Sequence, residues 1–112
     1  MGTGHCQLTV TAPTVEEAER LARLGVEARL AACAQVSGPV RSTYWWKGEV
    51  TVAEEWVCTF KTTGPLAEEL GLRLRRAHSY EVPEIVVTGI GGGDPDYLAW
   101  ITEETAGGGP AD

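Results

Sequence analysis

The fold of this chain is decided by one stretch, VRSTYWW (40–46), KG (47–48) and EVTVAEEWVCTFK (49–61). Both long runs are rich in aromatic and β-branched residues, which are typical of strands. Glycine in a two-residue connection favours a tight hairpin turn, because it adopts positive φ at little cost. With the turn at Lys47-Gly48, Trp45 faces Val50, and Arg41 faces Glu54 as a favourable pair of opposite charges.

The predicted hairpin is unusually long for a chain of 112 residues. At about 3.3 Å per residue, the run 49–61 extends roughly 43 Å, whereas most strands have about five or six residues. The hairpin carries Tyr44, Trp45, Trp46 and Trp56, which are rarely left in water as a group. We therefore predict that a second copy of the chain covers the arm. A bulge that folds the arm back onto its own chain is the alternative.

Before the hairpin the sequence predicts a strand, a helix and a second strand. The run 6–12 alternates apolar and polar residues and ends at a proline. Thr14-Val15-Glu16-Glu17 has the form of a capping box and predicts a helix over 15–31. The run 30–36 then reads as a second strand, interrupted at Ser37-Gly38-Pro39.

After the hairpin, Pro65 begins a predicted helix that runs to Ala77, and 84–90 form the fourth strand. Asp94-Pro95 then caps a short third helix. The order β-α-β-β-α-β with a terminal helix predicts an α+β fold, the ferredoxin-like split β-α-β sandwich with a long hairpin. We expect a single domain over 1–112, with a core of about 6–105 and a flexible tail over 106–112.

Composition excludes several classes of function. The net charge of −7 and the absence of a basic run make nucleic acid a poor partner. Residues 1–12 lack the features of a signal peptide, and 18 apolar residues never run together, so we expect a cytoplasmic protein with no membrane partner. The three cysteines, Cys6, Cys33 and Cys58, have no zinc spacing and are expected to be buried thiols.

The densest group of titratable side chains lies in AHSYEVPEIVV (77–87), where a polar cluster enters a strand at Pro83. His78, Glu81 and Glu84 could form a metal or proton-transfer site, since imidazole and carboxylate suit zinc or copper(II). Alternatively, His78 caps the preceding helix while the glutamates form salt bridges.

Other candidate sites are weaker. Gly91–Gly93 precede a helix whose start carries Asp94 and Asp96, and these carboxylates would oppose a bound anion, so the glycines are interpreted as a loop. The sequence shows no serine or cysteine nucleophile beside a base, so we do not expect an enzyme. Lys61 is either a cation that faces a ligand or a solvated residue at a strand end.

Several ordered motifs together resemble the CutA divalent-ion tolerance family over about residues 7–101. They are Thr11-Ala12-Pro13, Arg29-Leu30-Ala31-Ala32-Cys33-Ala34, Tyr44-Trp45-Trp46-Lys47-Gly48, Lys61-Thr62, Tyr80-Glu81-Val82-Pro83-Glu84-Ile85 and Gly93-Asp94-Pro95-Asp96-Tyr97-Leu98-Ala99-Trp100. The resemblance implies a ferredoxin-like subunit in a tight homotrimer, whose hairpins extend onto neighbouring subunits. It also implies a trimer that looks like the PII signalling proteins.

The resemblance further implies a non-enzymatic protein associated with tolerance of copper or another divalent cation, without an organic cofactor. His78 and Glu81 are the metal ligands that it suggests. The inter-subunit cleft would be lined by Tyr44, Trp46, Lys61, Tyr80, Glu84 and Trp100. Ala77 and Val10 stand where some members carry a histidine and a cysteine, so His78 alone remains of that ligand set. A PII-like small-molecule sensor and a scaffold without a ligand are the alternatives.

Overall fold

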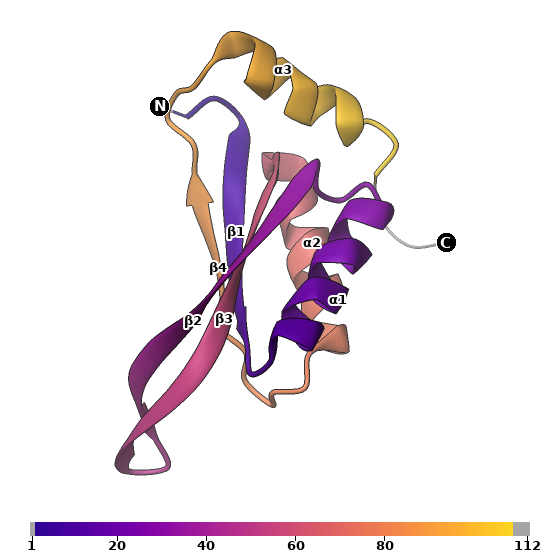
Figure 1. Ribbon diagram of the computed structural model, residues 1–112. Helices are drawn as coiled ribbons and strands as arrows, with labels where there is room; N and C mark the ends of the chain where they lie inside the picture. Colours follow the sequence, from indigo (N-terminus) through magenta and orange to yellow (C-terminus); the bar gives the residue numbers. More distant parts are fainter. Residues whose placement is uncertain (1, 109–112) are drawn as a thin grey trace.

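The structure, a computed structural model, describes residues 2–108 and consists of one antiparallel sheet with two helices against one face and a third across one end (Figure 1). The elements are β1 (His5–Ala12), α1 (Val15–Glu27), β2 (Cys33–Trp46), β3 (Glu49–Thr63), α2 (Gly64–Ala77), β4 (Ile85–Gly89) and α3 (Pro95–Glu104). The expected flexible tail falls largely on residues 109–112, which lie outside the described residues.

The strand order β2-β3-β1-β4 confirms the predicted ferredoxin-like split β-α-β arrangement. Leu8 pairs with Phe60, and these side chains turn to the face that α1 and α2 cover. Leu21 and Leu70 from the two helices complete this core and are fully buried. Because side chains alternate along a strand, the opposite face, which we call the open face, carries the neighbouring positions Gln7, Thr59 and Lys61.

Helix α1 ends four residues before its predicted end, because the backbone turns left-handed at Arg29, with φ of 59°. The amide of Leu30 donates to the carbonyl of Gly25 at 3.0 Å, and that of Arg29 donates to Val26 at 3.0 Å. These two bonds form a Schellman cap, which usually has glycine in the left-handed position. The sequence carries arginine there, so the usual glycine signal for a helix end was missing.

The hairpin has the predicted turn and register. Lys47 and Gly48 both have positive φ, 50° and 82°, as a two-residue type I′ turn requires. Trp45 pairs with Val50, and Arg41 pairs with Glu54, as predicted.

The predicted interruption at Ser37-Gly38-Pro39 is a register shift inside a continuous β2, which is a bulge, and it does not end the strand. Gly38 has φ of 139°, and a Cβ there would lie 3.1 Å from the carbonyl oxygen of Glu55. The arm still projects past the helices (Figure 1), and Trp45 is 74% exposed. Trp56 is partly buried against the core, but the bulge leaves Tyr44, Trp45 and Trp46 exposed within one chain.

The remaining elements lie close to their predicted bounds. Strand β4 starts one residue later than predicted, at Ile85, and the side chain of Asp94 caps α3 by accepting the Tyr97 amide at 3.0 Å. Helix α3 contacts the open face, since Tyr97 lies 3.5 Å from the Cys33 sulfur and Thr102 lies 2.8 Å from His5. No helix of residues 2–108 is long and apolar enough to span a bilayer.

Candidate functional site

A hollow of about 720 Å³ lies where the hairpin arm passes the segment after α2. It is lined by Thr11, Ser42, Thr43, Tyr44, Trp45, Trp46, Glu55, Tyr80, Glu81, Val82, Pro83 and Glu84. Its walls therefore combine four aromatic rings with three carboxylates. Lysine, arginine and histidine are absent from these lining residues.

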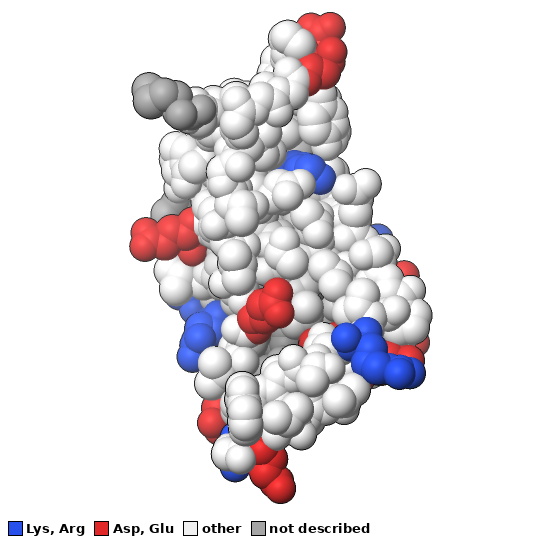
Figure 2. All heavy atoms as spheres, turned by 90° about the vertical axis from the view of Figure 1, so that its left-hand side faces the viewer, with Lys and Arg blue, Asp and Glu red and all other residues white. Residues whose placement is uncertain are grey.

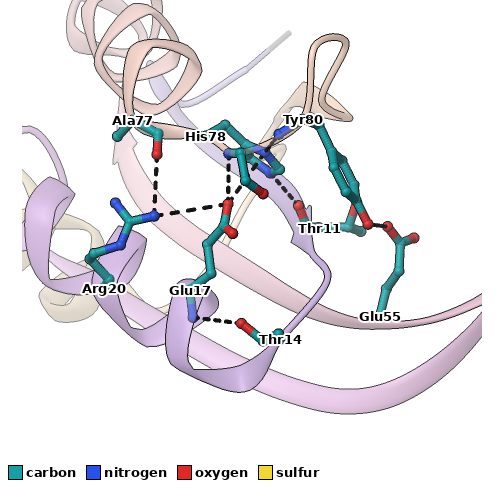
Figure 3. A network of polar contacts seen from close by, with 9 residues as sticks. Thr11, Thr14, Glu17, Arg20, Glu55, Ala77, His78 and Tyr80 are labelled. Carbon is teal, nitrogen blue, oxygen red and sulfur yellow. Dashed lines mark hydrogen bonds and ion pairs between the residues drawn. The ribbon is translucent and has the colours of Figure 1, made fainter.

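His78 is the first residue after α2, and its side chain is fully buried. Its Nδ1 accepts a hydrogen bond from the backbone amide of Tyr80 at 3.0 Å, so this nitrogen carries no proton. Its Nε2 lies 2.6 Å from the carbonyl oxygen of Thr11 and must donate to it. The neutral ring thus ties the segment after α2 to the end of β1, as Figure 3 shows.

Glu17 holds the same segment from the first turn of α1. One carboxylate oxygen accepts the Ser79 amide at 2.9 Å and lies 3.5 Å from His78 Nδ1 (Figure 3). Burial, the largest single effect, would raise the pKa of the Glu17 carboxyl, but the hydrogen bonding from Ser79 and the nearby charge of Arg20 together lower it. Thr14 caps the Glu17 amide at 3.1 Å as predicted, while the Glu17 side chain reaches across to Ser79 and not back to Thr14.

Tyr80 reaches from this segment into the hollow. Its hydroxyl donates to the Glu55 carboxylate at 2.8 Å, and Glu55 is only 5% exposed. Burial, and next the hydrogen bond to Glu55, raise the pKa of Tyr80 well above its ordinary range. The hydroxyl therefore stays protonated and serves as a donor at neutral pH.

The structure gathers part of the predicted site. Tyr44, Trp46, Tyr80, Glu81 and Glu84 line the hollow together. Lys61 instead lies on the open face, where its ammonium donates to Gln35 at 3.1 Å. Trp100 lies on α3 and stacks on Tyr97, with ring centroids 5.6 Å apart. A cleft that also includes Lys61 and Trp100 would need a second subunit and stays a prediction.

The donors within one chain do not form a ready metal site. Both ring nitrogens of His78 are engaged in hydrogen bonds, and no group of three or more histidine, cysteine, aspartate or glutamate side chains in residues 2–108 is placed to hold a metal ion. Glu81 is exposed at the rim of the hollow. Metal binding by His78 and Glu81 therefore stays a prediction, and it would require His78 to exchange a hydrogen bond for a metal bond.

Glu55 and Thr11 are the site residues that the sequence did not reveal. Glu54 and Glu55 are neighbours in β3, so strand alternation places one on each face of the sheet. Alternation does not predict the hydrogen bond between Glu55 and the Tyr80 hydroxyl, which lies 25 positions away in the sequence. Thr11 contributes through its backbone carbonyl, which leaves no signal in the identity of the residue.

Comparison with known proteins gives consistent matches. The family described as CutA1 divalent ion tolerance protein matches residues 6–104. The divalent-cation tolerance protein CutA of Thermus thermophilus is 40% identical over 96 residues, which cover 86% of this chain and 93% of that protein.

Solved structures agree with the fold. CutA from Xylella fastidiosa has a TM-score of 0.89 at 31% identity, covering 92% of this chain and 99% of that one. The structure described as the periplasmic divalent cation tolerance protein CutA from Archaeoglobus fulgidus has a TM-score of 0.87 at 36% identity. The match covers 90% of this chain and 98% of that one. That structure is described as periplasmic, so the cytoplasmic location that we expect for the present chain stays a prediction.

Proposed function

The chain belongs to the CutA1 divalent ion tolerance protein family, and from this premise we propose that it is a single-domain, non-enzymatic homotrimer that serves divalent cation tolerance by binding. The observation that carries the assembly is the uncovered hairpin arm. Trp45 is 74% exposed, and Val50 and Val52 are each 57% exposed. Apolar surface of this kind is usually covered by a partner, and a second copy is the simplest partner.

The open face supports the same proposal. Figure 2 views the side opposite to α1 and α2, and charged side chains there are few and scattered. Val86 on β4 is 48% exposed. A largely uncharged surface that continues into the arm suits contact between copies, because burying it leaves few charged side chains without solvent or a partner.

Light scattering tests the assembly. We expect a mass near three times 12.0 kDa for the wild type. Val52→Ser removes apolar surface on the arm and should lower the mass on dilution. Leu72→Ser is the matched control, since Leu72 is 45% exposed on α2, and it should leave the mass unchanged. A wild-type monomer, or equal effects of the two variants, would contradict the proposed interface.

Binding without covalent chemistry is supported by the state of the buried thiols. Burial raises the pKa of Cys58 to about 12 and also raises that of Cys6. Thiols with such pKa values are protonated at neutral pH and make poor nucleophiles.

Copper(II) is the ion that we propose first, with Glu81 and His78 as its donors, because carboxylate and imidazole together suit it. Calorimetric titration with copper(II) should give a smaller heat for Glu81→Gln and His78→Gln than for the wild type. Glu68→Gln, an exposed change on α2, is the charge-matched control. Equal heats for all four proteins would remove both residues from the site.

A second candidate function is binding of a small effector, and the hollow favours it. A volume of about 720 Å³ lies within the range of small-molecule sites, and its aromatic and polar walls are typical of them. A thermal melting screen tests this candidate, because a ligand that binds only the folded state raises the transition temperature. A screen without any such ligand would count against it.

A further inference from the structure

We propose that the hollow between the hairpin arm and the segment after α2 binds a small organic cation, an ammonium of the quaternary or alkylated type. The inference rests on the effector-binding candidate above and gives the chemical class of its ligand. Two independent features of the walls point to a positive charge: a group of aromatic rings, and a buried carboxylate that has no cationic partner among residues 2–108.

The carboxylate is that of Glu55. Its residue is 5% exposed, and among the described residues its hydrogen-bond donor is the hydroxyl of Tyr80. Within residues 2–108 no lysine, arginine or histidine nitrogen forms a salt bridge with Glu55. A buried carboxylate is costly unless a positive charge compensates it, and a neutral hydroxyl compensates only part of the charge. We therefore expect the compensating positive charge to come from outside residues 2–108.

The aromatic rings select the kind of cation. Tyr44, Trp45, Trp46 and Tyr80 all line the hollow. Aromatic faces attract weakly hydrated organic cations, and cages of such rings recognise quaternary ammonium groups. Trp46 already makes a cation–π contact within this chain, since the Lys47 nitrogen lies 5.7 Å from the centroid of its ring.

A bare metal ion fits these walls less well. Glu55, Glu81 and Glu84 all line the hollow, yet they do not converge into a group placed to hold a metal ion in the described part of the chain. A divalent ion needs several oxygen ligands at short range, whereas an organic cation gains from charges and rings spread around it. The dispersed carboxylates therefore favour the larger, softer cation.

A lysine or arginine from a neighbouring copy is the competing source of the positive charge. In that case the hollow would be filled in the trimer, and an added cation would find no space. The two sources therefore predict opposite outcomes for a titration of the assembled wild-type protein.

Calorimetric titration with choline chloride tests the inference, alongside the neutral analogue in which a tert-butyl group replaces the trimethylammonium. We expect choline to bind and the neutral analogue to bind about tenfold more weakly or worse, as expected for the loss of a desolvated cation–π and charge contact. Equal affinity for the two compounds, or no binding of choline, would overturn the inference.

Glu55→Gln keeps an acceptor for the Tyr80 hydroxyl but removes the charge, and we expect it to weaken choline binding about tenfold. Glu54→Gln changes the net charge equally on the exposed side of the same strand and should change binding by less than about twofold. Glu81→Gln removes a charge at the exposed rim of the hollow and leaves the buried hydrogen bond between Tyr80 and Glu55 intact, which gives a second test. Equal responses of all three variants would refute a specific site.

The outcome separates this inference from the proposed functions. If choline does not bind, but the heats of copper(II) titration still differ between the variants as expected, only the organic-cation inference is refuted. If a neutral or anionic compound raises the melting temperature and choline does not, effector binding stands and its ligand class is wrong.

Discussion

Replacing Glu17 with glutamine tests whether the charge on this carboxylate holds the segment after α2 in place. Its oxygen accepts the Ser79 amide at 2.9 Å, and its side chain is only 10% exposed. A hydrogen bond to a charged group contributes about 1.5–3 kcal/mol, and a neutral one contributes about 0.5–1.5 kcal/mol. Glutamine can keep the neutral bond, so the expected loss of unfolding free energy is about 1 kcal/mol at pH 7. Arg20 adds little, since it is 4.0 Å away and 53% exposed.

The pH dependence of this loss has a defined sign. The pKa of Glu17 is lowered in the folded protein, so its charge stabilises the fold at pH values above the unfolded pKa. That contribution disappears as the pH falls through the lowered folded pKa. The wild type and Glu17→Gln should therefore differ at pH 7 and converge as the pH falls below the lowered folded pKa.

Urea unfolding at matched protomer concentration measures this loss, because the stability of the proposed trimer would depend on concentration. Amide hydrogen exchange at Ser79 gives a local measure and should accelerate in Glu17→Gln. Glu16→Gln is the matched control, since Glu16 lies in the same helical turn and is exposed. The reasoning is refuted if both variants lose the same stability at pH 7, or if the loss in Glu17→Gln does not shrink as the pH falls into the acid range.

Three further predictions concern single residues. His78→Ala leaves the Thr11 carbonyl and the Tyr80 amide without their partner, and we expect a loss of about 2–5 kcal/mol in urea unfolding; a loss below about 1 kcal/mol would show that water replaces the ring. The Cys58 thiol is fully buried with a pKa of about 12, so its reaction with a thiol reagent should not accelerate between pH 7 and 9 unless the protein unfolds; acceleration in the folded protein would contradict this burial. Gly38→Ala forces a side chain into φ of 139° and brings its Cβ within 3.1 Å of a carbonyl oxygen of β3, so we expect a loss of about 1–3 kcal/mol; an unchanged unfolding midpoint would show that the bulge can rearrange.

The elements of the fold were predictable because their signals are local. Alternation in β1, the Thr14 cap and the Lys47-Gly48 turn each act within a few residues, and all three appear in the structure. The end of α1 was not predictable, because arginine at position 29 occupies a left-handed cap that normally signals itself by glycine. Ser37-Gly38-Pro39 predicts a break in the strand, because glycine and proline are typical of both breaks and bulges and the sequence does not distinguish the two.

The site was only partly predictable from the sequence. Tyr80, Glu81 and Glu84 are close in sequence, and their proximity in the hollow follows from the short segment that carries them. Tyr44 and Trp46 join them because the arm curves past that segment, which depends on the bulge and on the twist of the whole sheet.

The sequence by itself determined the order of elements, the register of the hairpin and the family, because each depends on residue types at fixed spacing. Only the tertiary structure decided what His78 and Glu55 do. Burial places His78 between Thr11 and Tyr80 with both nitrogens in use, and it leaves Glu55 with a hydroxyl as its partner. Such roles depend on contacts between residues as many as 67 positions apart, which no local pattern encodes.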